Sequence, residues 1–104
     1  INMARDFGNA VVDIAVAYNE DIDQVIGLMK KVAAELRTDP NFGPVILDDL
    51  DVAGVNELAG SAVMVRARLR CKAQEQFRVR RELLHRLKKA FDYAHIEIPL
   101  RIQN

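Results

Sequence analysis

Four cations alternate with apolar residues along one segment and form the most concentrated chemical feature of this chain. They are Arg66, Arg68, Arg70 and Lys72. A cationic row on an open sheet face could bind nucleic acid, but domains that do so stack bases on aromatic side chains of their central strands. Here cations occupy those positions, with Met64 as the only other residue on that face. We therefore predict no nucleic-acid partner and favour a solvated or salt-bridged face, or an interface within an assembly.

Cys71 and His85 are candidates for a nucleophile and its general base. The alternation of the segment points Cys71 toward the interior, whereas His85 falls on the polar side of the helix that follows. We interpret Cys71 as a buried, inert thiol and His85 as a surface side chain. His95 has no partner that the sequence identifies.

Asp48, Asp49 and Asp51 could supply oxygen ligands to a hard cation, which needs several such ligands at fixed spacing. The run lacks the glycine and the distal glutamate of an EF-hand loop, so loop solubility is the preferred interpretation. A phosphate loop, zinc-ligand spacing and a nucleophile elbow are also missing from the sequence. We predict no enzyme, no catalytic, cofactor-binding or metal residues, no cofactor and no small-molecule substrate.

The size and composition of the chain predict one globular domain. Its 104 residues are 50% hydrophobic and 29% charged, with a net charge of zero. No apolar run approaches the ~18 residues that a membrane span needs. Cys71 is the single cysteine, which suits a reducing compartment. Because the chain begins at Ile1, we interpret it as a piece of a longer protein.

The charges are distributed unevenly along the chain. Residues 1–61 carry 11 acids and 4 bases, whereas residues 62–104 carry 11 bases and 4 acids. Two consequences remain open. The acidic and basic regions could attract a second copy head to tail, a contact that closes into rings, or they could satisfy each other within the domain.

Hydrophobic periodicity predicts a strand followed directly by a helix in the first half. Residues 9–18 alternate as a half-buried strand, and the polar turn at residues 19–21 opens a helix whose apolar stripe extends to Leu36. The acids of this turn can cap unpaired backbone donors and complement the helix dipole. Asp39-Pro40 ends the helix, and a short turn follows at residues 45–50.

The second half predicts two strands, a helix and a last short strand. The strands span residues 51–58 and 62–73, with a reversal at Gly60-Ser61, and the helix spans residues 74–94. Its predicted core stripe comprises Phe77, Leu83, Leu84, Leu87, Ala90, Phe91 and Ala94. Ile96 to Pro99 reads as an edge strand. The order β-α-β-β-α-β predicts an α+β, ferredoxin-like sandwich: a four-stranded antiparallel sheet with both helices on one face.

The amino-acid sequence of these elements resembles that of the C-terminal cytoplasmic domain of the small-conductance mechanosensitive channels, the MscS-like family. The matching segments are residues 12–18 with 21–23, 55–58, 61–68, 81–92 and 96–99. Asn2 to Phe7 resembles the tail of a preceding β-domain, which assigns residues 1–8 to that tail or a linker and residues 9–104 to the C-terminal domain. His95 stands where the family commonly has glycine, and Arg70 where some members carry tryptophan.

The resemblance implies a function that no local motif supplies. The parent protein would be a tension-gated ion channel of the inner membrane that relieves osmotic stress, with this domain on the cytoplasmic side. Seven copies would form a homoheptamer, in which the domain contributes to assembly and to a solute-filtering cage below the pore. The alternative is a stand-alone ferredoxin-like regulatory or small-ligand-binding module, disfavoured because a Gly-rich strand–helix loop is missing.

Overall fold

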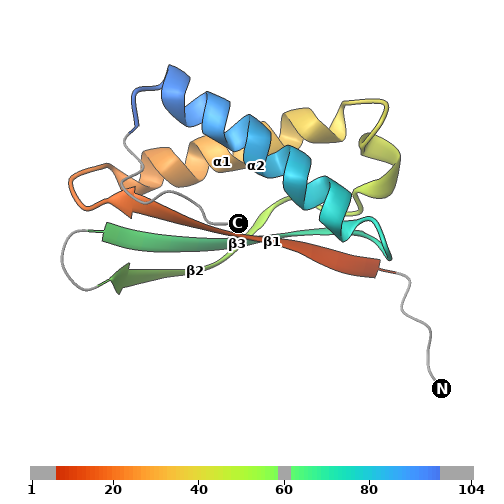
Figure 1. Cartoon of the computed structure of the whole chain (residues 1–104), viewed down its shortest axis with the longest axis horizontal. Coiled ribbons are helices and arrows are strands. Elements are labelled where there is room, and N and C mark those ends of the chain that lie inside the picture. Colours follow the sequence, from red (N-terminus) through yellow and green to blue (C-terminus); the bar gives the residue numbers. More distant parts are fainter. Residues whose placement is uncertain (1–6, 59–61, 97–104) are drawn as a thin grey trace.

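The computed structural model describes residues 7–58 and 62–96, which contain three strands and two α-helices (Figure 1). The order is β1 (Phe7–Ala17), α1 (Ile22–Arg37), a 3₁₀ turn η1 (Gly43–Val45), β2 (Asp51–Leu58), β3 (Ala62–Lys72) and α2 (Gln76–Tyr93). The strands form one antiparallel sheet in the order β1-β3-β2, and both helices lie across one face of it. The fold class is therefore α+β, as predicted.

The predicted alternation is confirmed for β3 and for the first part of β1, but Ala15 and Ala17, predicted to lie on the other face of β1, are buried as well. Ala10, Val12, Ile14 and Val16 of β1 are buried beneath the helices. On β3, inward apolar residues alternate with an exposed row on the opposite face from Arg66 onward. The two strands pair over their full lengths, from Phe7 opposite Lys72 to Ala17 opposite Ala62. β1 begins at Phe7, two residues before the predicted start.

Helix α1 begins directly after Asp21, which caps its N-terminus. The Asp21 carboxylate accepts hydrogen bonds from the backbone N–H groups of Asp23, at 3.0 Å, and Gln24, at 3.4 Å. These bonds satisfy two of the donors that a helix start leaves unpaired, which confirms the capping role. The helix ends at Arg37, just before Asp39-Pro40, and its predicted apolar stripe faces the sheet. The buried members are Val25, Met29, Val32, Ala33 and Leu36.

Helix α2 differs from the prediction at its start and in its stripe. It begins at Gln76 because Gln74 has a φ of 76°, a left-handed conformation that cannot continue into an α-helix. Phe77, predicted to be in the core, is 70% exposed. Val79, which the predicted stripe omitted, is fully buried.

The expected four-stranded ferredoxin-like sheet remains a prediction. The described residues form three strands, and most of the predicted last strand, residues 97–99, lies outside them. Ile96, the first residue of that predicted strand, is 5% exposed and packs in the core.

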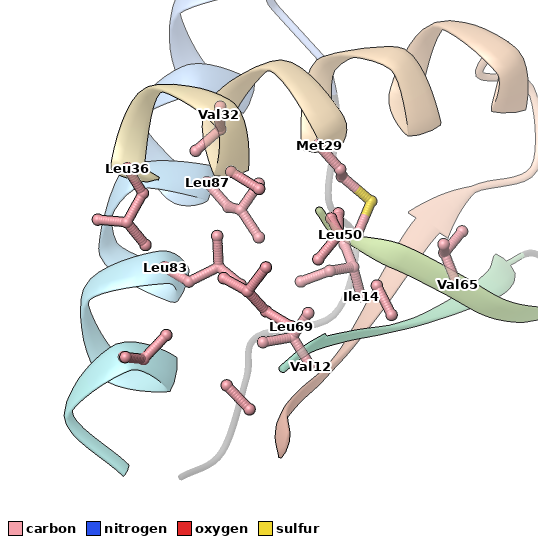
Figure 2. Packing of buried hydrophobic residues seen from close by; sticks show 14 of the residues in the cluster. Val12, Ile14, Met29, Val32, Leu36, Leu50, Val65, Leu69, Leu83 and Leu87 are labelled. Atoms are coloured by element: carbon pink, nitrogen blue, oxygen red, sulfur yellow. The ribbon is translucent and has the colours of Figure 1, made fainter. Parts of the chain in front are cut away.

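One hydrophobic core fills the space between the sheet and the helices (Figure 2). Val32 and Leu36 of α1 lie near Leu83 and Leu87 of α2 in this view, whereas Met29 extends toward Leu50 and Ile14. The segment before β2, predicted only as a short turn, also contributes to the core. Its Ile46 and Leu50 are 4% and 6% exposed.

Candidate functional site

The cationic row of β3 lies on the open face of the sheet, and three of its members are paired with carboxylates. Arg66 makes two hydrogen bonds to Asp13 of β1, from Nε to Oδ1 at 2.8 Å and from Nη2 to Oδ2 at 3.0 Å. The two residues are directly opposite each other in the strand register. Cross-strand neighbours are close enough for such a two-pronged contact, which suits the planar guanidinium.

The next two arginines pair with the other side of the sheet. Arg68 Nη2 donates to Asp51 Oδ2 of β2 at 2.9 Å, again between register partners. Arg70 lies 3.9 Å from Asp48, and its guanidinium carbon stands 4.4 Å from the centre of the Phe7 ring. The salt-bridged interpretation of the row is thus confirmed for these arginines.

The Asp48–Asp51 loop also reaches α1, because Asp49 pairs with Arg37 at the end of that helix. The three carboxylates of the loop therefore contact three different arginines. No group of His, Cys, Asp and Glu within residues 7–58 and 62–96 has the arrangement to hold a metal ion. A solvent-open depression of about 420 Å³ lies here, lined by this loop together with Asn9, Arg68 and Arg70.

A second charged cluster ties the loop after α1 to α2. Arg86 of α2 contacts Asp39, and its Nε donates to Glu82 Oε2 at 2.8 Å. Asp39 also accepts a hydrogen bond from the backbone N–H of Asn41 at 2.8 Å. Its carboxylate is one-fifth exposed, which makes it the most enclosed acid among the ion pairs of the described residues.

Two carboxyl groups have pKa values below the ordinary range as a result of these contacts. The hydrogen bonds from Arg66 lower the pKa of Asp13, and the charges of Arg66 and Arg80 act in the same direction against partial burial. The pKa of Asp39 is lowered first by the Asn41 backbone N–H and then by Arg86. Both carboxylates are therefore stabilised in the folded chain relative to the unfolded one.

The uneven charge distribution is at least partly satisfied within the domain. Four acids of the first half pair with four bases of the second half. These pairs are Asp13–Arg66, Asp51–Arg68, Asp48–Arg70 and Asp39–Arg86. Head-to-tail attraction between copies stays a prediction that rests on the remaining charges.

Cys71 and His85 do not approach each other. Cys71 is fully buried under the helices, where burial raises the pKa of its thiol and the charge of Glu75 acts in the same direction. Its Sγ lies 3.8 Å from the Gly8 carbonyl oxygen. His85 is exposed on α2. Both positions agree with the prediction, and the pair does not form a nucleophilic site.

The helix layer carries the most exposed aromatic side chains of the described residues. Tyr93, near the end of α2, is 89% exposed, and Phe77, near its start, is 70% exposed. Beside Tyr93, Val32 and Ala90 line a shallow depression of about 400 Å³ between the two helices. Neither helix of the described residues is long and apolar enough to cross a membrane.

The sequence of this domain matches a model of the C-terminal domain of the mechanosensitive ion channel MscS. The match covers residues 10–98 and thus nearly every element described above. The chain belongs to this family. The family is one of ion channels, and the relatives below are named as channels, not as enzymes.

Two relatives that are named as mechanosensitive channels are each 28% identical to this chain. The chain is 28% identical to the small-conductance mechanosensitive channel of Caldanaerobacter subterraneus subsp. tengcongensis over 101 residues, which cover 94% of this chain and 34% of that protein. It is 28% identical to the moderate conductance mechanosensitive channel YbiO of Escherichia coli over 99 residues, which cover 95% of this chain and 13% of that protein. The chain therefore spans about a third or less of these relatives.

Two solved structures have the same fold as this domain. The closed-state crystal structure of Helicobacter pylori MscS aligns with a TM-score of 0.73 and 26% identity, over 96% of this chain and 38% of that one. Arabidopsis thaliana MSL1, solved by cryo-EM, aligns with a TM-score of 0.65 over 93% of this chain and 35% of that one. At 12% identity this second likeness concerns the fold alone.

Proposed function

We propose that this chain is the C-terminal domain of a subunit of a tension-gated mechanosensitive channel in the inner membrane. It lies on the cytoplasmic side, contributes to the assembly of a homoheptamer, and forms part of a solute-filtering cage below the pore. The observation that carries this proposal is the match of residues 10–98 to the MscS C-terminal domain, together with the shared fold.

The surface of the domain supports a role in assembly. Aromatic side chains are enriched in protein–protein interfaces, and α2 exposes Phe77 and Tyr93 near its two ends. A neighbouring copy of the same domain is the partner expected in a ring of identical subunits.

The ion pairs of the sheet face support a passive, structural part in a filter. Arg66, Arg68 and Arg70 are each matched by an acid, so this face presents alternating charges of both signs. Such a face does not concentrate either cations or anions strongly, because the fields of adjacent opposite charges largely cancel. A cage wall of this kind selects solutes mainly by size.

The proposal is tested with the full-length gene product that contains this chain. It is expressed in bacteria that lack their own mechanosensitive channels, and survival of hypo-osmotic shock and tension-activated current in membrane patches are measured. We expect the complete protein to protect the cells, and a form lacking residues 10–98 to lose assembly and current.

The matched control carries Asp92→Asn, which removes an exposed ion pair with Lys88 and leaves the core and the aromatic residues unchanged. It should behave as the complete protein does. A complete protein that carries no tension-activated current, or a discrete dimer with a bound metabolite, would contradict the proposal and favour a regulatory module.

A further inference from the structure

The loop that precedes β2 is attached to the rest of the domain by an unusual concentration of ion pairs. Three of the four residues from Asp48 to Asp51, which comprise the end of this loop and the first residue of β2, are acids that each contact a different arginine. The pairs are Asp48 with Arg70, Asp49 with Arg37, and Asp51 with Arg68. We propose that this loop is a latch between α1 and β3 that tightens at low ionic strength and loosens as ionic strength rises.

The pairs of the latch are exposed enough for salt to act on them. The side chains of Asp48, Asp49 and Asp51 are 65%, 87% and 63% exposed. Between exposed charges the range of attraction falls from about 30 Å at 0.01 M salt to about 3 Å at 1 M. At the high end of this range the screening length is comparable to the separations within these pairs, so the attraction between the loop and its arginines is weakened.

Backbone pairing holds this segment at its two ends. Ile46 forms an isolated bridge with Cys71, and the Leu47 N–H donates to the Arg70 carbonyl oxygen at 2.9 Å. Regular pairing of β2 with β3 then resumes at Asp51. The apolar anchors between these points are Ile46 and Leu50.

The Asp13–Arg66 pair offers an internal comparison, because its surroundings are different. It connects β1 and β3 in the middle of a continuous antiparallel pairing that runs from Phe7 to Ala17. Local opening there must break many backbone hydrogen bonds, so one ion pair is a small part of its cost. Between Leu47 and Asp51 regular strand pairing is interrupted, so beside the burial of Leu50 the ion pairs are a larger share of the cost of local opening, which should therefore respond to salt.

The latch connects the end of α1 to β3, so its state changes how rigidly the helix layer is attached to the sheet. In a channel that opens when the cell is diluted, ionic strength falls as the channel acts, and the latch would then be at its tightest. That consequence rests on the proposed function, whereas the salt response of the loop does not.

The test measures backbone hydrogen exchange of the 104-residue chain by NMR between 0.05 M and 1 M KCl at constant pH. The reporter is the Leu47 amide, whose hydrogen bond to Arg70 must break before exchange. Loss of three exposed ion pairs of typical strength would together shift the equilibrium between the closed and the locally open loop about tenfold. We expect Leu47 to exchange about tenfold faster at the high salt concentration, with no such change when sucrose of equal osmolality replaces KCl.

Two variants separate the latch from general salt effects. The triple variant D48N/D49N/D51N should exchange rapidly at Leu47 at both salt concentrations. The control D13N/D92N removes two ion pairs elsewhere and should keep the tenfold response. A native Leu47 amide that changes less than twofold with KCl would overturn the proposal, as would a triple variant that keeps the native response. Should the triple variant not fold, the comparison of KCl with sucrose on the native chain decides alone.

Discussion

Replacing His95 by glycine is expected to stabilise the domain. His95 follows helix α2 with a φ of 60°, the left-handed conformation that non-glycine residues rarely adopt. Its N–H donates to the Asp92 carbonyl oxygen at 3.2 Å, and the Ile96 N–H donates to the Phe91 carbonyl oxygen at 2.9 Å. These two bonds form a Schellman motif, in which the residue at the position of His95 is usually glycine.

The magnitude follows from two opposing contributions. The left-handed conformation costs an L-residue about 1–2 kcal/mol, a cost that glycine does not have. Glycine also gives the unfolded chain more conformational freedom, and this stabilisation of the unfolded state offsets about 0.4–1 kcal/mol of the gain. The net expectation for His95→Gly is a gain of about 0.5–1 kcal/mol, or roughly 3–6 °C in Tm for a domain of this size.

Urea unfolding followed by circular dichroism measures this change, with the slope m expected to stay constant. His95→Ala is the matched control, because it also removes the imidazole but keeps a Cβ in the left-handed conformation. It should be no more stable than the native chain. Gln74, with a φ of 76° before α2, provides an independent second site for the same pair of substitutions. A His95→Gly variant no more stable than His95→Ala would refute the assignment of strain to this backbone position.

Three further predictions follow from burial and charge. Gly27→Ala should stabilise α1 by about 0.5–1 kcal/mol, because a Cβ there meets no atom within 4 Å. Gly43→Ala should instead destabilise the domain by more than about 1 kcal/mol, because its Cβ would lie 2.4 Å from a backbone carbonyl oxygen. Urea unfolding compares the two variants. Cys71 should react with a thiol reagent only as fast as the domain unfolds, because its thiol is buried and its pKa is raised; a native-state rate near that of a free thiol would contradict this. The pKa values of Asp13 and Asp39 are lower in the folded chain than in the unfolded one. The two carboxylates therefore stabilise the fold fully above about pH 4, and this contribution is lost as the pH falls through their pKa values in the folded chain. The free energy of unfolding of the double variant D13N/D39N, measured in urea titrations, should fall less steeply below about pH 4.

The elements with strong periodicity could be predicted from the sequence, because burial alone determines their pattern. The alternation of β3 from Val63 to Lys72 and the stripe of α1 from Val25 to Leu36 are both found as predicted. Each of these segments buries one face against a single continuous core, so the apolar positions reveal the orientation directly.

The prediction for α2 was wrong at Phe77, and helical geometry explains why. At 100° per residue, Phe77 lies about 120° from Leu83 and about 80° from Leu87 around the helix. It stands at the edge of the apolar stripe in the first turn, where it is exposed, while Val79 packs inward. Apolar spacing alone did not separate a residue at the edge of the stripe from one at its centre.

The ion pairs of the candidate site could be anticipated as a class but not as partners. The alternation placed the β3 arginines on an open face, yet pairing Arg66 with Asp13 requires the strand register, which joins residues 53 positions apart. The ion pairs of Arg37 and Arg86 were not predicted. Both contact loop acids whose positions depend on how the chain turns after α1, and no periodic pattern reports such turns.

We propose that this domain forms part of the cytoplasmic cage of a mechanosensitive channel. Single-particle cryo-EM of the full-length gene product in lipid nanodiscs tests it most directly. We expect a seven-fold symmetric particle in which seven copies of this domain surround a closed space beneath the membrane. A particle without that symmetry, or one in which the domains stand apart and enclose no space, would contradict it.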